Sequence, residues 1–493
     1  MHPLVALLAV AFAQQPTTTL PDTLPGKRFD EFMTAFNTKS SKQIDAMIAR
    51  NFAQSALRIL SKEEWTTRIS GATNVAPISV DEVLKSSDST IVVRIKSKSI
   101  APLAIRLDLE SEAPFGIVGA KMGAPADLLD STAPRRYTKW ETITTLAEQI
   151  QADYKLPSLS IAYKVIGSKS QEISVGVKST FTKDDMEPGD RLWIGGAGKA
   201  MTATLIAHMV DMKKISWKTT IAEAMPGFPM SDVYKDVTLE QLIHHLSRIP
   251  QHVQIIGTKT EKEMADAPTS TAIRKAYVAA VLNQEQAPIT SSSFDDSDVD
   301  FTVAAYMLER LIGKPYEWLM QRYVFEPMKL STVLIQQLCT DGQVGTPGNV
   351  YGHLISDQGG FTPYQIPGSK VEIALAPAGS CITCTLTDLV KFAEFHLKGI
   401  QGDAQVLTAD SYKRIHSLLN GKGTACGWTI NPSYASEACQ SISSSNGAFA
   451  VDLSLWPDNN MVIAAIANAA SPKRPSPTMQ AVLAVRDRIE KKG

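Results

Sequence analysis

The sequence predicts two successive α+β domains, and the second, larger domain builds one antiparallel sheet from both ends of its own stretch of chain. Within residues 27–124, apolar residues at helical spacing give way to strict alternation. In the larger domain, strand-like segments at 158–165 and 172–177 precede a long helical region, and strand-like segments return only at 448–456 and 461–468. A chain of 493 residues has room for both domains, since one domain takes roughly 150 residues.

Composition narrows the classes of function. Hydrophobic residues make up 44% of the chain and charged residues 20%, as in ordinary globular proteins. The formal net charge is -1, so no overall positive field favours nucleic acid or anionic lipid as a partner. Beyond the first residues, no stretch approaches the roughly 20 apolar residues that a membrane-spanning helix needs. We therefore expect no nucleic-acid partner and no membrane span.

The N-terminal residues predict export. Leu4–Phe12 is a short apolar run, and Ala11-Phe12-Ala13 has the small-x-small pattern of a signal-peptidase site. We expect a signal peptide at residues 1–13, a Pro/Thr linker at 14–26, and a periplasmic or extracellular bacterial protein. The alternative is an ordinary buried N-terminal helix, since no Lys or Arg precedes the apolar run.

The small domain, residues 27–124, is predicted to contain two or three helices followed by an antiparallel sheet. Phe29, Phe32 and Phe36 recur at helical spacing. Strands are expected at 91–95, 103–109 and 117–122. This order of elements resembles the nuclear-transport-factor-like (SnoaL-like) cone domain. Because the segment contains no His and no Cys, it offers few groups that transfer protons near neutral pH, and we expect a binding or scaffold role.

A linker at 125–136 is expected to lead into the larger domain at 137–493. An amphipathic helix at 140–154 opens this domain, and a helix at 477–492 ends it. Helices and strands at both ends enclose the helical block, which implies a single antiparallel sheet assembled from the two ends.

The segment Leu192–Ala203 carries the most specific pattern, with Gly195-Gly196-Ala197-Gly198-Lys199 followed by an apolar helical run. It resembles the start of the buried helix that carries Ser-x-x-Lys in the serine β-lactamase and penicillin-binding-protein family, which includes class C β-lactamases and D-Ala-D-Ala carboxypeptidases. In that family the lysine amine takes the proton of the serine hydroxyl. Lys199 stands at the lysine position, whereas Gly196 stands at the serine position and has no side chain to attack a substrate.

Further segments extend the resemblance through the larger domain. Asp296-Ser297-Asp298 aligns with the family's Tyr-x-Asn motif, counted back from Glu309–Gly313. Other matching segments are Val237–Pro250, Val324–Met328, Ala376–Ser380 and Thr385–Leu389. In the first of these, Arg248 replaces a glycine. Thr385 and Asp388 have the spacing of an N-terminal helix cap.

The family's third motif, Lys-Thr-Gly or His-x-Gly, should lie just before Gly447. The chain there reads Gln440 to Asn446 with no Lys, His or Gly. The resemblance implies that the cation which holds a substrate carboxylate in the family is missing. The residues that we expect to line the binding cleft are Lys199, Asp298, Ser443, Ser444 and Gly447.

A half-buried lysine without a hydroxyl partner needs a charge of opposite sign nearby. We predict that Lys199 pairs with Asp296 or Asp298 and stays protonated, which would prevent it from acting as a base. The vestigial site then consists of Gly196, Lys199, Asp296, Ser297 and Asp298.

Because removal of the nucleophile of a serine protease costs about a millionfold in turnover, we expect a catalytically inactive member of this serine hydrolase family. It would act as a binding or scaffold module in the cell envelope. Its expected ligand is a peptidoglycan-derived peptide or another small acyl compound, and no cofactor is expected. Two alternatives stay open. One is an active hydrolase (β-lactamase, esterase or D-Ala peptidase type) with Ser247, Ser297 or one of Ser443–Ser445 as nucleophile, and the other is a purely structural envelope protein.

Other patterns favour structural roles. Gly195–Lys199 lacks the spacing of a phosphate loop. His244, His245 and His252 have no acidic residue at metal-ligand spacing, so we expect structural histidines, His245 among them, and no metal.

Five cysteines spread over a long chain are not a disulfide framework. Cys426 and Cys439 flank a Pro-containing turn and could form a disulfide across two strands. Cys381 and Cys384 have redox spacing, but no thioredoxin-like pattern surrounds them, so packing or a local disulfide is favoured.

Overall fold

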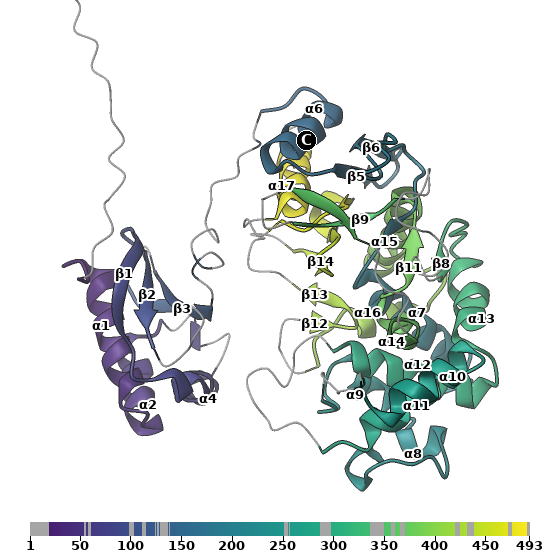
Figure 1. Ribbon diagram of the computed structural model, residues 1–493, viewed down its shortest axis with the longest axis horizontal. Coiled ribbons are helices and arrows are strands. Elements are labelled where there is room, and N and C mark those ends of the chain that lie inside the picture. Colours follow the sequence, from purple (N-terminus) through teal and green to yellow (C-terminus); the bar gives the residue numbers. More distant parts are fainter. Residues whose placement is uncertain are drawn as a thin grey trace, which may run out of the picture. The chain divides into compact units, whose positions relative to one another are not determined.

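The computed structural model shows two compact units, residues 1–133 and 134–493, and each is described by itself (Figure 1). The residues it describes are 19–53, 56–57, 61–97, 103–110, 115–123, 125, 128, 137, 139–250, 255, 257–285, 297–335, 350–355, 360–364, 370–419, 424–430, 438–471 and 476–490. Several predicted features lie outside the described residues, namely the signal peptide at 1–13, most of the linker at 125–136, His252 and Asp296.

The N-terminal unit contains helices and a four-stranded antiparallel sheet in the order β1-β2-β3-β4. The helices are α1 (Leu24–Asn37), α2 (Ser41–Asn51) and α4 (Lys62–Gly71), and the strands are β1 (Ser79–Ser86), β2 (Thr90–Lys96), β3 (Leu103–Leu109) and β4 (Ile117–Gly123). Aromatic residues of the helices, such as Phe29 and Phe36, pack with Val93 and Leu107 of the sheet in one apolar core. This arrangement confirms the small α+β domain.

Two details of this unit differ from the prediction. Helix α1 begins at Leu24, inside the predicted linker, because the Oγ1 of Thr23 accepts the amide hydrogen of Gly26 at 3.3 Å and Pro25 fits the first helical turn. Strand β1 was not predicted. Its pairing with β2 has register shifts between Val80 and Glu82 and between Val83 and Lys85, which disrupt a regular alternation of apolar residues.

The larger unit contains a seven-stranded antiparallel sheet in the order β12-β13-β14-β15-β16-β5-β6. Its strands are β5 (Ser158–Val165), β6 (Gln171–Gly176), β12 (Thr424–Ala425), β13 (Trp428–Ile430), β14 (Gln440–Ser445), β15 (Ala450–Trp456) and β16 (Met461–Ala467). The last long strand pairs with the first, from Met461 opposite Val165 to Ala467 opposite Leu159. The predicted sheet from both ends of the domain is therefore confirmed.

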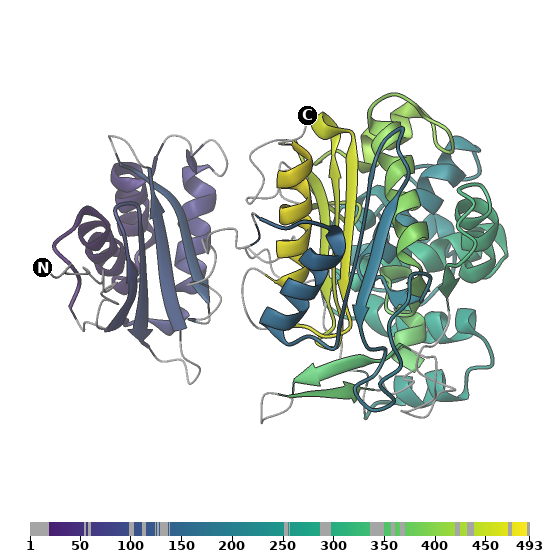
Figure 2. The same ribbon diagram turned by 90° about the horizontal axis from the view of Figure 1, so that it is seen from above.

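Helices cover both faces of this sheet, as Figure 2 shows. Helices α6 (Ile143–Tyr154) and α17 (Pro477–Glu490) pack on one face, and α15 (Leu386–Ile400) packs on the other. All seven residues of β16 are buried, because its alternate side chains enter different cores on the two faces.

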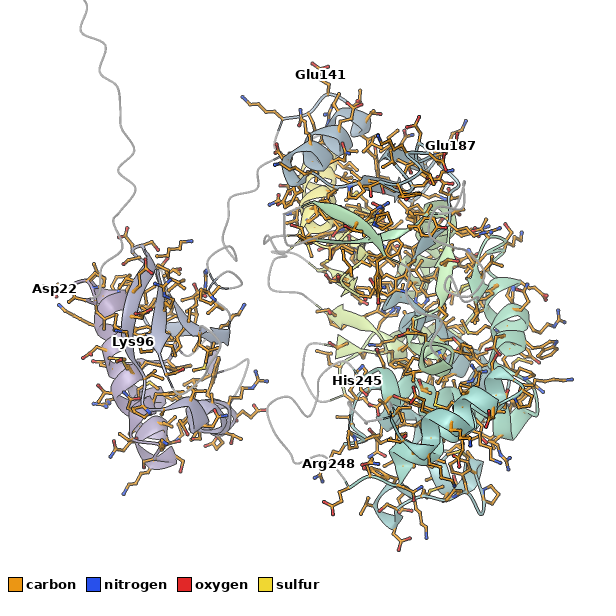
Figure 3. All side chains as sticks on the ribbon, viewed as in Figure 1. Asp22, Lys96, Glu141, Glu187, His245 and Arg248 are labelled. Atoms are coloured by element: carbon orange, nitrogen blue, oxygen red, sulfur yellow. The ribbon has the colours of Figure 1, made fainter. Side chains whose placement is uncertain are left out.

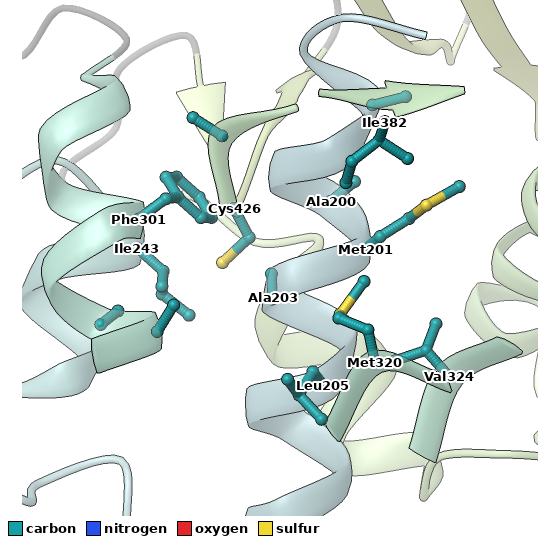
Figure 4. Packing of buried hydrophobic residues seen from close by; sticks show 14 of the residues in the cluster. Ala200, Met201, Ala203, Leu205, Ile243, Phe301, Met320, Val324, Ile382 and Cys426 are labelled. Carbon is teal, nitrogen blue, oxygen red and sulfur yellow. The ribbon is translucent and has the colours of Figure 1, made fainter. Parts of the chain in front are cut away.

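The inserted helical region surrounds one central helix, α7 (Ala197–Asp211). Residues 197–207 of α7 are all buried, which confirms the predicted buried helix. In Figure 4, its residues Ala203 and Leu205 lie among Phe301, Met320 and Val324. The other helices of the region are α8 (Ile221–Ala224), α9 (Leu239–Ile243), α10 (Lys259–Asp266), α11 (Ser270–Leu282), α12 (Asp298–Ile312) and α13 (Tyr316–Met320).

The expectation that strands return only near the end of the chain was wrong. Two small sheets lie within the inserted region, formed by strands too short to show an alternating pattern in the sequence. One contains β7 (Leu192–Trp193), β11 (Ile382–Cys384) and β8 (Leu334–Ile335), and the other contains β9 (Gly352–Ile355) and β10 (Phe361–Tyr364). Among the described residues, every helix is too short or too polar to cross a bilayer.

Of the predicted cap pair of α15, Thr385 caps the helix as expected and the Asp388 side chain does not. Thr385 is the N-cap residue, and its Oγ1 accepts the amide hydrogen of Asp388 at 3.3 Å. The carboxylate of Asp388 bonds elsewhere, since its Oδ2 accepts the Thr332 amide at 2.7 Å and the Thr332 hydroxyl at 2.6 Å. The cap residues therefore also fix the segment before β8.

The disulfide considered between Cys426 and Cys439 is not present. Both residues are buried thiols, and they belong to apolar cores on different faces of the sheet. Cys381 and Cys384 are likewise buried thiols. All four residues therefore contribute to packing, and Cys339 lies outside the described residues.

A buried histidine pair links α15 to helix α16 (Ala409–Ile415). Nδ1 of His396 lies 2.8 Å from Nε2 of His416, and Oγ1 of Thr204 lies 3.1 Å from the other nitrogen of His396. Nδ1 of His416 contacts Oε1 of Gln440. Burial lowers the pKa of His396, and burial lowers the pKa of His416 to about 4.

This pair predicts loss of stability in weak acid. Unfolding raises the pKa of His416 from about 4 toward the ordinary 6.5, so the stabilisation is complete above pH 6.5 and is lost as the pH falls. In urea denaturation, His416 alone should lower the free energy of unfolding by about 2 kcal/mol between pH 7 and pH 5. The variant His416→Gln should show a smaller pH dependence. Equal stability of the wild type at the two pH values would contradict this assignment.

Candidate functional site

The site is built around the start of α7. Gly196 is the N-cap residue, with φ -55° and ψ -13°, and the amide of Lys199 donates to the Gly196 carbonyl oxygen at 3.0 Å. Residues three apart lie on one face of a helix. Lys199 therefore lies one turn into the helix, on the side of residue 196, as the Ser-x-x-Lys spacing predicts.

The glycines of this segment differ in the space around them. A Cβ atom on Gly198 would lie 2.4 Å from Cα of Gly379, so these two backbones are in direct contact and exclude a side chain. A Cβ atom on Gly196 would have its nearest neighbours, atoms of Ile442 and Ser444, at 3.5 Å. That is an ordinary van der Waals distance. Packing therefore requires glycine at 198 but leaves room for a side chain at 196.

Lys199 forms an ion pair across the site. Its Nζ lies 2.6 Å from Oδ1 of Asp298, and the two side chains are 5% and 54% exposed. The predicted pairing is confirmed for Asp298. A carboxylate at this distance stabilises the ammonium form of a lysine. That Lys199 stays protonated remains a prediction.

The position of Asp298 is set by the N-terminus of α12. Ser297 is the N-cap residue, and its Oγ accepts the amide hydrogen of Asp300 at 3.3 Å. The Ser297 amide donates to Nδ1 of His245 at 3.0 Å, and Oγ of Ser247 donates to Oδ1 of Asp300 at 2.5 Å. These bonds fix the start of α12 to the segment that follows α9.

His245 is hydrogen-bonded to the start of α12 rather than to Asp300. Its Nδ1 accepts the Ser297 amide hydrogen and so carries no proton, which means that the 3.6 Å approach to Oδ2 of Asp300 is not an ion pair. Burial raises the pKa of Asp300, and the hydrogen bond from Ser247 and the charge of Lys199 oppose that rise. His245 therefore helps to position α12, in agreement with a structural role.

Arg248 takes the backbone conformation that glycine favours. Its φ is 62°, and this is the position where the family resemblance places glycine. A non-glycine residue in this conformation costs on the order of 1 kcal/mol. Residue 248 thus has a backbone conformation that glycine would adopt without this cost. Figure 3 labels Arg248 and His245 in the same region of the larger unit.

Strand β14 faces the start of α7. Atoms of Ile442 and Ser444 are nearest to the Cβ position of residue 196, and strand alternation places both side chains on one side of the sheet. Ser443 points to the opposite side and lies across from Asp452 of β15. Oδ2 of Asp452 accepts the hydroxyl of Thr478 at the start of α17, on the other face of the sheet.

The structure thus brings together part of the predicted cleft. Lys199, Asp298 and Ser444 lie at the start of α7, whereas Ser443 is turned away. Gly447 lies in the turn after β14, where its amide donates to Oγ of Ser445 at 3.1 Å.

Sequence reasoning missed an acidic residue beside the site. Glu372 lies on α14 (Lys370–Ala374), and its carbonyl oxygen accepts the hydroxyl of Ser380 at 2.6 Å. The carbonyl of Ser380 in turn accepts Nε1 of Trp193, just before the glycine segment, at 3.1 Å. Burial and the charge of Asp298 raise the pKa of Glu372. The sequence offered one signal for Glu372: it stands a few residues before the segment Ala376–Ser380, which matches the family.

Acidic groups lie on the side of Lys199 that faces α12. Asp298 pairs with it, Asp300 lies close enough to interact with its charge, and Glu372 interacts with Asp298. Burial, Asp298 and Glu372 together raise the pKa of Tyr277, which is 4% exposed on the neighbouring helix α11. Because Lys199 already pairs with Asp298, it is not available as a cationic partner for a ligand carboxylate.

The neighbouring histidine and cysteine have a packing role. Nε2 of His244 lies 3.4 Å from Sγ of Cys426, and both side chains are buried. Burial lowers the pKa of His244 to about 4, and burial raises the pKa of the Cys426 thiol. A buried thiol of raised pKa is a poor nucleophile. Within the described part of the chain, no group of three His, Cys, Asp or Glu residues is arranged to hold a metal ion.

The space at residue 196 predicts different outcomes for the same substitution at two glycines. Gly196→Ser should change the free energy of unfolding by less than about 1 kcal/mol, because its Cβ would have no neighbour closer than 3.5 Å and its φ of -55° suits any residue. Gly198→Ser should cost more than about 2 kcal/mol, because its Cβ would overlap the Gly379 backbone. Urea denaturation of both variants measures this, and equal losses would contradict the packing described.

Comparison with known proteins agrees with this geometry. The beta-lactamase family model matches residues 143–486, more than half of the chain. The chain is 22% identical over 305 residues to penicillin-binding protein PbpX of Bacillus subtilis (strain 168), and the match covers 60% of this chain and 66% of that protein. It is 24% identical over 293 residues to penicillin-binding protein 4 of Amycolatopsis lactamdurans, covering 56% of this chain and 68% of that protein.

Solved structures share the fold. A beta-lactamase from Sulfitobacter sp. EE-36 superposes with a TM-score of 0.55 at 15% identity, covering 72% of this chain and 100% of that one. An octameric penicillin-binding protein homologue from Pyrococcus abyssi superposes with a TM-score of 0.55 at 17% identity, covering 71% and 77%. With the family model, the antiparallel sheet and the helix that starts at Gly196, these findings show that the chain belongs to the beta-lactamase family.

Proposed function

We propose that this chain is a catalytically inactive member of the beta-lactamase family that binds a small ligand in the cleft at the start of α7. The proposal rests on what the structure shows at residues 196 and 199. Residue 196 has no side chain at the N-cap of α7, and Lys199 is held by Asp298 at 2.6 Å. Acyl transfer through the family route needs both a hydroxyl and a base that accepts its proton.

The packing of the cleft supports a retained binding role. Gly198 and Gly379 still pack backbone against backbone, and Arg248 still adopts a positive φ. These features hold the start of α7, the segment after α9 and the start of α12 together. A chain under no constraint to keep a cleft would gain from relieving the strained backbone at Arg248.

The ligand is proposed to be a peptidoglycan-derived peptide or another small acyl compound. Among such ligands, the acidic groups near Lys199 favour those whose end at this site is an amide, an ester or an amine rather than a carboxylate. Export to the cell envelope and a binding or scaffold role for the N-terminal unit belong to the same proposal. The apolar filling of that unit supports a scaffold role, since its core is made of side chains such as Phe29, Ile48 and Leu107.

The test is covalent labelling with a fluorescent penicillin, followed by intact mass and by turnover. The wild type should form no adduct and release no product. The variant Gly196→Ser should form an adduct on residue 196 only slowly, because its hydroxyl would stand one helical turn from Lys199 while Lys199 is still paired with Asp298. The double variant Gly196→Ser with Asp298→Asn should form it faster, because Lys199 would then lose the carboxylate that favours its charged form.

Two outcomes would contradict the proposal. One is a penicillin adduct or product from the wild type, which would require an active site. The other is a failure to bind. The proposal predicts that a peptide ending in D-Ala-D-Ala amide raises the melting temperature of the wild type without being cleaved. If neither this amide nor its free carboxylate form shifts the melting temperature, a purely structural role is favoured instead.

A further inference from the structure

The serine residues near the cleft are not equivalent. Five of them, Ser247, Ser297, Ser443, Ser444 and Ser445, are the candidates for a replacement nucleophile. A nucleophile needs an accessible hydroxyl on the side of the sheet that faces α7, and that hydroxyl must not already be committed to the fold. The hydrogen bonds of each serine decide which one satisfies both conditions.

Two of the serines hold the start of α12. Ser247 is 2% exposed, its Oγ donates to Asp300 at 2.5 Å, and the same oxygen accepts the amide of Ile249 at 3.0 Å. Ser297 is 3% exposed, and its Oγ caps the helix by accepting the Asp300 amide. Both hydroxyls are buried and fully used in positioning the backbone.

Two other serines do not meet these conditions: one side chain lies on the opposite face of the sheet, and the hydroxyl of the other is used in hydrogen bonds of the turn after β14. Ser443 lies across from Asp452, on the face of the sheet covered by α17. The Oγ of Ser445 donates to the Phe449 carbonyl at 2.8 Å and accepts the Gly447 amide at 3.1 Å. These bonds close the turn after β14.

Ser444 remains, and it lies beside residue 196. Its Oγ is 3.6 Å from the point where a Cβ atom of residue 196 would stand, and 2.6 Å from the corresponding point of residue 195. The side chain is half-buried on the α7 side of the sheet. The hydroxyl therefore faces the N-terminal end of a helix of 15 residues, whose dipole and amide groups favour negative charge on a nearby oxygen.

We propose that Ser444 is the phosphonyl-accepting residue of this site, its hydroxyl approaching the start of α7 from strand β14, beside residue 196. The inference rests on the proposed function, since it assigns reactivity without turnover. With Lys199 paired to Asp298, the attack has no positioned base, so only reagents with a good leaving group react. The adduct then persists, because its hydrolysis lacks the same base.

The reaction with a fluorophosphonate probe is written as a balanced step. The Oγ of Ser444 attacks phosphorus, an O–P bond forms, the P–F bond breaks and fluoride leaves, while the hydroxyl proton passes to solvent. No oxidant, metal or cofactor takes part. A penicillin, whose reaction in the family depends on a base and on a cation for its carboxylate, does not react at this residue.

The experiment labels the full-length wild type with a fluorophosphonate probe and maps the adduct by peptide mass spectrometry. A single adduct on Ser444 is expected. In the variant Ser444→Ala, labelling of this peptide should fall at least about tenfold. The matched control Ser443→Ala changes the adjacent serine on the opposite face and should keep labelling within about twofold of the wild type.

Mapping of the wild type makes the result independent of how the variants fold. An adduct on another residue, no adduct at all, or unchanged labelling of Ser444→Ala at that peptide would overturn the assignment of Ser444. The proposed function fails separately, through a penicillin adduct or penicillin turnover by the wild type. Fluorophosphonate labelling at Ser444 without penicillin reaction supports both proposals.

Discussion

The ion pair between Lys199 and Asp298 is the interaction on which the site depends. An ammonium group that is 5% exposed on a central helix must be neutralised, because an isolated charge inside a protein is strongly destabilising. Its partner comes from the first turn of α12, so the start of that helix has to lie against α7. The bonds of Ser297 to His245 and of Ser247 to Asp300 hold it there. One electrostatic requirement thus links three separate segments of the chain.

The backbone around this pair is held by contacts that do not involve a side chain at residue 196. Gly198 packs directly on Gly379, and the segment before α7 is tied through Trp193 and Ser380 to Glu372. Such contacts hold the start of α7 whatever side chain residue 196 carries. At the site itself, residue 196 has no side chain and Lys199 is paired with Asp298. Fold and reactivity are therefore determined by different residues, as expected when function resides in a site on a common scaffold.

Much of the fold was predictable because long elements leave clear periodic patterns. Strand β5 and helix α7 are long and regularly buried, so their spacing in the sequence identified them. Strand β1 was missed because its pairing contains register shifts, and strands of two or three residues such as β7 and β11 carry no pattern. In the site, the charge requirement of Lys199 predicted its pairing with an aspartate. Glu372 could not be predicted, because its place depends on how distant segments pack. Ser444 was expected near the site together with Ser443, but the sequence could not tell which of the two faces α7, because that depends on the face of β14 that a residue occupies.

The central claim is that Asp298 keeps Lys199 as an ammonium ion. The direct measurement is an NMR titration of the full-length protein with labelled lysine side chains, in which the Lys199 signal is assigned by its loss in Lys199→Met. The account predicts that the chemical shift of the Lys199 Cε stays that of a charged lysine between about pH 6 and pH 9. A Cε signal that titrates within this range would show a neutral amine near physiological pH, and it would contradict the claim that Lys199 cannot act as a base.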